Sequence, residues 1–340
     1  MKTTASRRLG AFAGLAAAAA LTLTACSVST AGSPSDDTDD GAASQELTYQ
    51  IGWLPTVEWG ANWIADAEGY YEDEGIAFEW LPGGPNVSPD TVVTAGTATV
   101  GNASAEVVAS AINAGAPLKI IGAAFQQSPF SIVSLADSPI ETPEDMIGKR
   151  IGVAASNQTQ FETFLQINGI DPSALEIVPV QFDPSPVANG EVDGQVVYSI
   201  NEPAQLNVQG IDTYTMLFAD YGFEVLTDTI FATEETIANE PELLASFLRA
   251  SQRGYLDMFE DPAAAADLAV NEYGSDQGLS VDHQTLEVEA MAELVMPEGQ
   301  EAPLLMSDER MAGTVETLGL GGIEISVDEL FDTSVQDLLR

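Results

Sequence analysis

Polar and aromatic side chains follow several apolar runs of this sequence, at points where a strand would end. Residues 198–203 read YSINEP, directly after the apolar pair Val196–Val197. Tyr198 offers a ring, while Asn201 and Glu202 offer an amide and a carboxylate. Such groups bind a ligand by stacking on its ring and hydrogen bonding to its polar edge. They need neighbouring elements that end at the same place.

Groups of the same kind follow the other apolar runs. In a parallel α/β sheet the C-terminal ends of the strands share one edge, where ligands bind. The candidates at such strand ends are Trp53, Gly83, Gly84, Asn102, Ser104, Phe125, Gln126, Asn157, Gln158, Tyr198, Asn201 and Glu202. Aromatic faces and amides with little positive charge suit a planar, neutral or weakly basic heterocycle.

Each candidate also has a purely structural interpretation. The rings of Trp53 and Phe125 suit a hydrophobic core. Asn102 and Asn157 suit helix caps. Glu202 suits the first turn of a following helix, where the helix dipole favours an acid. For Glu202 the two roles are compatible.

Catalytic and metal-binding patterns are scarce. His283 is the single histidine and Cys26 the single cysteine, so a His or Cys metal cluster cannot be built. No nucleophile stands in a recognisable relation to His283, which is expected at the surface. The sequence has neither G-x-G-x-x-G after a strand nor G-x-x-x-x-G-K-[ST]. We therefore expect no catalytic residue, metal or cofactor, and predict that the chain is not an enzyme.

Strand-like and helical runs alternate from Leu47 onward, as in LTYQIGWL, IAFEWL, AEVVASAINAG and PLKIIGAAF. A second series starts near Ser138, and beyond Phe231 the pattern turns mostly helical, ending in a predicted helix over SVDELFDTSVQDLL. This alternation predicts parallel sheets covered by helices. A chain of 340 residues is long enough for two α/β lobes. We expect the chain to cross between them near residues 131–134 and 229–232.

The N-terminus has the features of an export signal. MKTTASRR is positively charged, a small-residue apolar stretch follows, and LTAC ends at Cys26. These last four residues resemble the bacterial lipobox, whose cysteine is lipidated. The alternative is an ordinary secretory signal ending near a buried cysteine. Residues 27–46 are rich in Ser, Gly, Thr and Asp, which predicts a flexible tether.

The net charge is −43, from 53 acidic and 10 basic side chains. A field of this sign repels nucleic acids and anionic lipid headgroups. The simplest interpretation of the acidic excess is a solvated, salt-adapted surface. Nucleic-acid binding is not expected.

The order of the motifs resembles that of the substrate-binding lipoproteins of bacterial ABC importers. The resemblance rests on the lipobox and on GWLPTVEWGANWIADAEGYYEDEGIAFEWLPGG, TVVTAGTATVGNAS, GKRIGV, EVDGQVVYSINEPAQL and FLRASQRGYLDMFEDPAAAADLA, spanning about residues 47–275. Within this family, the sequence is similar to the branch that binds thiamine-pyrimidine precursors or riboflavin. That branch is related to the binders of sulfonates, taurine and nitrate. This implies a type II periplasmic-binding-protein fold, in which two α/β lobes close over a ligand in the cleft between them.

The resemblance also implies a layout and partners. The expected parts are a lipoprotein signal peptide (1–25), a tether (26–46), lobe I (47–132 plus 231–340) and lobe II (133–230). It adds Trp59 and Asn62 to the pocket and implies a monomer. The expected partner is an ABC permease with its ATPase, at the outer face of the cell membrane. Pyrimidine binders often carry a histidine at the place where this chain reads VEWGAN, which contains none. This departure favours a larger ligand such as a flavin.

Three alternatives remain. A sulfonate, taurine or nitrate ligand needs donors from Arg, Lys or helix N-termini, and no Lys or Arg stands at the strand ends given above. Thiamine-pyrimidine synthases share the implied fold but depend on an active-site histidine and a cysteine-rich motif, which this chain lacks, so an enzyme is supported by fold analogy alone. A structural or adhesion lipoprotein would have no ligand cleft.

Overall fold

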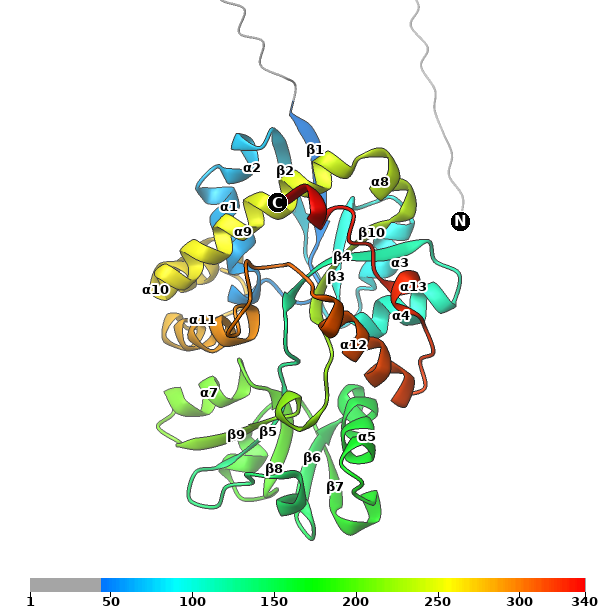
Figure 1. Cartoon of the computed structure of the whole chain (residues 1–340). Coiled ribbons are helices and arrows are strands. Elements are labelled where there is room, and N and C mark those ends of the chain that lie inside the picture. The colour runs from blue at the N-terminus through cyan, green and yellow to red at the C-terminus, as the bar shows by residue number, and fades with distance from the viewer. Residues whose placement is uncertain (1–43, 340) are drawn as a thin grey trace, which may run out of the picture. The chain divides into compact units, whose positions relative to one another are not determined.

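The computed structural model describes residues 44–339. Two five-stranded sheets form the centres of two α/β lobes (Figure 1). Their strand orders are β2-β1-β3-β10-β4 in lobe I and β7-β6-β8-β5-β9 in lobe II. The strands are β1 (Gln45–Gln50), β2 (Ile76–Leu81), β3 (Val100–Ala103), β4 (Leu118–Phe125), β5 (Phe130–Leu135), β6 (Arg150–Ala154), β7 (Glu176–Val180), β8 (Gly194–Tyr198), β9 (Thr213–Leu217) and β10 (Thr227–Thr233).

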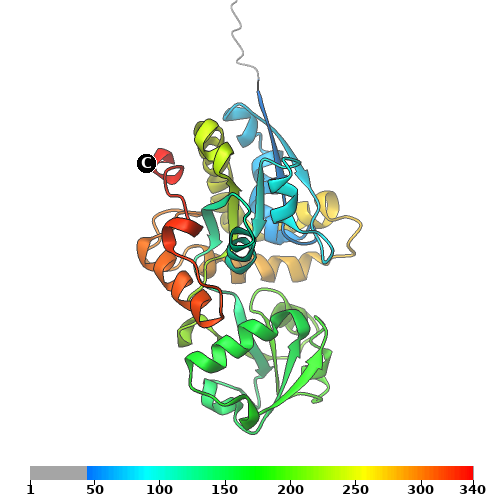
Figure 2. The ribbon, with the colours of Figure 1, turned by 90° about the vertical axis from the view of Figure 1, so that its right-hand side faces the viewer.

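Helices pack on both sheets, and Figure 2 shows α5 running beside the strands of lobe II. The α-helices are α1 (Gly60–Ala67), α2 (Tyr70–Asp73), α3 (Pro89–Thr94), α4 (Ala105–Asn113), α5 (Gln158–Ile167), α6 (Ser185–Ala188), α7 (Glu202–Val208), α8 (Glu234–Asn239), α9 (Pro241–Glu260), α10 (Pro262–Leu268), α11 (Val281–Val295), α12 (Asp308–Leu320) and α13 (Val327–Leu330). The helices after β10 return to lobe I, which confirms the two-lobed α/β architecture expected from the sequence.

The chain passes between the two sheets twice, through residues 126–129 and 218–226. The strand that follows each crossing, β5 or β10, runs antiparallel to its neighbours. The expected crossings, at 131–134 and 229–232, fall inside these two strands. The expected lobe boundaries, at 132/133 and 230/231, do so as well.

The strand register brings the two crossings to the edges where parallel strands end. In lobe I, Thr227 at the start of β10 pairs with Phe125 at the end of β4. In lobe II, Phe130 at the start of β5 pairs with Tyr198 at the end of β8. The strand ends at Phe125 and Tyr198 therefore lie beside the two crossings, which together we call the hinge.

Close packing between α9 and α1 supports lobe I. Along α9, residues 243, 244, 247, 248, 251, 254, 255 and 258 are buried, which is the spacing of one helix face. Gly254 lets α1 approach, because a Cβ there would lie 1.9 Å from the carbonyl oxygen of Ala61. In lobe II, Phe164 and Phe218 stack with ring centroids 3.8 Å apart.

The C-terminal stretch differs from the prediction. Residues 326–339 do not form one helix, because α13 ends at Leu330, Phe331 bridges to Ile120 and a separate short turn covers Gln336–Leu339. Helix α12 was not anticipated. The first strand begins at Gln45, two residues before the expected start of the fold. The predicted signal peptide, Cys26 and most of the tether lie outside the described residues.

A candidate ligand-binding cleft

Four carboxyl groups from both lobes come together near the hinge. They are those of Glu58 on the short helix Val57–Trp59, Asp228 in β10, Glu202 in α7 and Glu287 in α11. The side chains of Asp228, Glu202 and Glu287 are 7%, 5% and 3% exposed, and Glu58 is half-buried. The negative charges of the other three all raise the pKa of Glu58, which places the four within electrostatic reach of one another. We call them the carboxyl cluster.

The carboxyl groups of Glu58 and Asp228 lie close enough to each other to affect each other's ionisation. Burial raises the pKa of Glu58 well above its usual range, and the nearby charge of Asp228 adds to the rise. Burial also raises the pKa of Asp228, to about 6. Two buried carboxyl groups this close favour the form with one proton between them, and a ligand that separates them would meet one protonated and one ionised carboxyl group. Asp228 has a φ of 49°, a left-handed conformation that Asp tolerates better than most residues.

Glu202 ties the YSINEP segment to the helix that follows it. Its Oε2 accepts a hydrogen bond from the backbone N–H of Tyr198 at 3.1 Å. Burial raises the pKa of Glu202 to about 7, while hydrogen bonds from its own N–H and that of Tyr198 act in the opposite direction. Glu202 therefore has the structural role that the sequence allowed, and its contact with a ligand remains a prediction.

Glu287 is linked to the loop that carries Glu58. Gln284 donates from Nε2 to Oε2 of Glu287 at 2.5 Å and accepts the backbone N–H of Val57 at 2.8 Å. Burial raises the pKa of Glu287 to about 8, and the charge of Glu202 adds to this rise. Helix α11 packs against α7, so Glu287 and Glu202 face each other from different lobes.

Side-chain contacts also join the two lobes. Trp53 follows β1 and Phe182 follows β7, and their rings meet edge to face with centroids 6.1 Å apart. Both are accessible, at 38% and 52% exposure. His283 Nε2 lies 3.2 Å from the carbonyl oxygen of Asn201. The structure thus has the two lobes in contact with each other.

Replacing Phe182 with alanine should loosen this contact. We expect Phe182→Ala to weaken the closed arrangement by about 1 kcal/mol, the usual worth of an aromatic pair. The fluorescence of Trp53 should shift to longer wavelength as its ring gains water, while the melting temperature stays nearly constant. Tyr214→Ala, which removes another exposed ring in lobe II, is the control. An unchanged Trp53 emission spectrum would contradict a contact between the lobes in solution.

Three predicted site residues of lobe I have their contacts in its core. Trp59 is 2% exposed and donates from Nε1 to the carbonyl oxygen of Leu54 at 3.0 Å. Asn62 donates to the hydroxyl of Tyr71 at 2.8 Å. Phe125 is fully buried. Trp59 and Phe125 thus pack as the structural interpretation of the rings predicts, and Asn62 belongs to a buried polar network.

The other predicted residues of lobe I lie on the strand ends and around them. Gly83 packs against the loop after β1, since a Cβ there would lie 2.5 Å from the carbonyl oxygen of Trp53. Gly84 has a φ of 140°. Asn102 is buried, and its side chain lies near that of Tyr49. Ser104 precedes α4 but caps no backbone N–H.

The remaining predicted residues divide between the hinge and lobe II. Gln126 donates from Nε2 to the carbonyl oxygen of Ala123 at 2.7 Å and lines a separate cavity at the hinge. Asn157 is buried before α5 and does not cap it. Gln158 is exposed and bonds to Glu162 on its own helix. Tyr198 is half-buried and packs edge to face on Phe130.

The sequence prediction missed three members of the carboxyl cluster, Glu58, Asp228 and Glu287, and it missed Phe182 at the contact between the lobes. Asp228 left a signal, because it is the single charged residue between Glu224 and Glu234. Glu287 falls on the buried stripe of α11. Glu58 and Phe182 left no such signal, because nothing in the sequence distinguishes them from the other acids and aromatic rings of the chain.

In residues 44–339 no three His, Cys, Asp or Glu side chains are arranged to hold a metal ion. Over the same range no helix is long and apolar enough to span a bilayer.

Comparison with known proteins gives a consistent result. The family model described as NMT1/THI5 like matches residues 60–265. The riboflavin-binding protein RibY of Chloroflexus aurantiacus is 28% identical over 74% of each chain. The formylaminopyrimidine-binding protein of Halalkalibacterium halodurans is 24% identical over 74% of this chain and 75% of its own.

Enzymes and more distant binders match as well. The 4-amino-5-hydroxymethyl-2-methylpyrimidine phosphate synthase of Legionella pneumophila is 25% identical over 65% of this chain and 72% of its own. Among solved structures, the periplasmic aliphatic sulphonate-binding protein SsuA of Escherichia coli superposes with a TM-score of 0.63 at 13% identity, covering 81% of this chain and 91% of its own. That likeness concerns the fold alone, which is the periplasmic-binding-protein fold.

Proposed function

Since this chain belongs to the NMT1/THI5-like family, we propose that it captures a small aromatic nitrogen heterocycle by lobe closure and delivers it to an ABC importer. Riboflavin-like and thiamine-pyrimidine-precursor-like ligands are the two members of that class that its relatives suggest. The proposed partner is a membrane permease with its ATPase. The protein is proposed to act as a monomer and as a binder without catalysis.

The carboxyl cluster carries this proposal. An aminopyrimidine edge pairs an N–H donor with a ring nitrogen that accepts, and the Glu58–Asp228 pair offers an acceptor beside a donor. The uracil-like edge of a flavin also presents an N–H to a carboxylate. Tyr198 supplies an aromatic face near these groups, and Trp53 and Phe182 supply two further rings at the contact between the lobes.

The cleft chemistry disfavours an anion. No Lys or Arg contributes to the carboxyl cluster, and bringing a sulfonate or nitrate beside several carboxyl groups adds repulsion in a water-poor site. A sulfonate, taurine or nitrate ligand therefore remains the second candidate, supported by the likeness in fold to SsuA.

Capture follows from groups on both lobes. A ligand that bridges Glu58 and Asp228 in lobe I to Tyr198 in lobe II stabilises the closed arrangement over the open one. The permease would then recognise that closed form. Contacts already present between Trp53 and Phe182 and between His283 and Asn201 mark the surfaces that separate on opening.

Export and anchoring are part of the proposal. Lipidation at Cys26 would hold the protein at the outer face of the cell membrane, with the residues before Leu47 as a tether. Cys26→Ser should then move the protein from the membrane fraction to the soluble fraction, and unchanged fractionation would argue against the lipid anchor.

Calorimetry of the purified protein with riboflavin, formylaminopyrimidine and ethanesulfonate tests the ligand class. We expect binding of one heterocycle and no heat with the sulfonate. Tight binding of ethanesulfonate with no response to either heterocycle would favour the second candidate. No response in calorimetry or thermal shift to any small molecule would point instead to a structural or adhesion role.

A further inference from the structure

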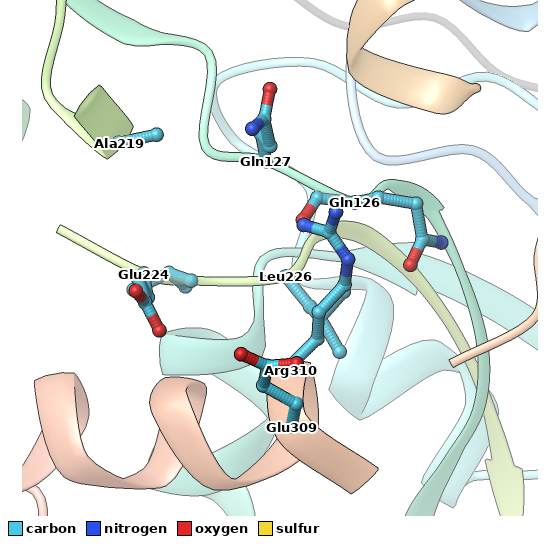
Figure 3. A pocket seen from close by; sticks show the side chains of 8 residues that line it. Gln126, Gln127, Ala219, Glu224, Leu226, Glu309 and Arg310 are labelled. Carbon is cyan, nitrogen blue, oxygen red and sulfur yellow. The ribbon is translucent and has the colours of Figure 1, made fainter. Parts of the chain in front are cut away.

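A cavity of about 240 Å³ lies at the hinge, apart from the carboxyl cluster. Its walls come from Gln126 and Gln127 in the first crossing, residues 224–226 in the second, and Glu309 and Arg310 at the start of α12 (Figure 3). None of its lining residues belongs to the carboxyl cluster. We propose that this hinge cavity is a second small-molecule site, which takes a small zwitterion and whose occupancy changes the balance between open and closed lobes.

Arg310 supplies the positive charge of the cavity. Its Nη1–H donates to the carbonyl oxygen of Gln126, while the side-chain amide of Gln126 points away from the cavity (Figure 3). The ion pairs of residues 44–339 involve Lys119, Arg150, Arg249 and Arg253, and Arg310 forms none within that range. A guanidinium has five N–H donors, so several are left for the anionic group of a ligand.

Glu224 and Glu309 supply the negative charge. Both side chains are exposed and line the same cavity, and in Figure 3 Glu309 lies across from Gln127. A simple anion would meet repulsion from the two carboxylates, and a simple cation would meet repulsion from Arg310. A small molecule with an ammonium group and an acidic group satisfies both sides, with the acidic group at Arg310 and the ammonium group at the glutamates.

Helix α12 makes this site sensitive to lobe movement. The hydroxyl of Thr314 accepts the backbone N–H of Leu226 at 3.0 Å. Gly313 lets Glu224 lie against α12, because a Cβ there would stand 2.4 Å from Glu224 Oε2. The same helix contacts α5 of lobe II. The cavity walls thus belong to segments that shift when the lobes rotate, so a ligand that fits one arrangement favours it.

Titration of the mature protein with glycine, β-alanine and taurine tests the site, with heat and Trp53 fluorescence as readouts. We expect at least one of these zwitterions to bind at millimolar concentration and to change the Trp53 emission. Arg310→Gln should weaken that binding by about ten-fold, equivalent to about 1.4 kcal/mol. Lys149→Gln makes the same charge change in lobe II and should have no effect. Glu224→Gln, at an exposed position, should also weaken binding and serves as the second variant.

Several outcomes would overturn the proposal: no binding of any of the three zwitterions, equal binding by wild type and Arg310→Gln, or equally good binding of acetate or methylammonium. Asp228→Asn separates this site from the proposed heterocycle cleft. Zwitterion binding should survive that substitution, and its loss would place the zwitterion in the cleft instead. If no heterocycle binds, the effect of Arg310→Gln on zwitterion binding still tests the hinge cavity.

Discussion

Asp228→Asn is expected to weaken heterocycle binding by about 100-fold, or about 2.7 kcal/mol, without destabilising the free protein. The loss is of the size expected for a hydrogen bond to a charged acceptor. The unliganded protein loses a buried carboxylate whose pKa is raised to about 6, so repulsion within the carboxyl cluster falls. Asparagine also accepts the left-handed φ of 49°. Affinity and stability should therefore move in opposite directions.

Two further variants sharpen this experiment. Asp228→Ala removes the same carboxylate but fits the left-handed backbone poorly, which costs about 1 kcal/mol more. Asp212→Asn makes the same chemical change at an exposed site in lobe II and should leave affinity and stability unchanged. Riboflavin and formylaminopyrimidine titrations give the affinities, and urea unfolding gives the stabilities. If Asp228→Asn binds the heterocycle as well as wild type does, the Glu58–Asp228 pair does not face the ligand.

The regular strands could be predicted because their apolar runs are bounded by turn residues. The strand-like run IAFEWL, residues 76–81, forms β2 with the same limits. The strands β5 and β10 were harder, since their residue types and spacing do not distinguish a strand from a segment that crosses between lobes. Helix α12 was missed because Gly313 and Gly319 lower its helix propensity and its apolar stripe is weak.

The site could be predicted only at the ends of strands. Tyr198 and Glu202 follow an apolar run, which made them visible, and the structure places both beside the hinge. Glu58 and Glu287 lie on helical segments among 53 acids, and their burial depends on tertiary packing that no local pattern encodes. Trp59 and Asn62 are residue types that also occur in ligand pockets. Their positions along the helical segment, however, direct both side chains into the core.

The stability of the protein should fall as the pH rises from about 4 to about 8. Burial raises the pKa of Glu287 from 4.5 to about 8 and that of Glu202 from 4.5 to about 7. Below pH 4.5 each group is protonated in both the folded and the unfolded chain. Above it the unfolded chain releases a proton that the folded chain retains, so folding becomes less favourable by up to about 1.4 kcal/mol per pH unit and group. Each contribution levels off above the raised pKa.

Glu287→Gln should remove the largest of these contributions. At about pH 8.5 we expect the variant to be more stable than wild type by on the order of 3 kcal/mol, with little difference near pH 4.5. The new amide oxygen can still accept the hydrogen bond from Gln284. Glu289→Gln, an exposed position on the same helix, should follow the wild-type curve in urea unfolding across the pH series. Parallel curves for Glu287→Gln and wild type would show that Glu287 titrates normally. A bound ligand that donates N–H groups to Glu287 and Glu202 would favour their ionised forms and lower their pKa values, so it should reduce the wild-type pH dependence as well.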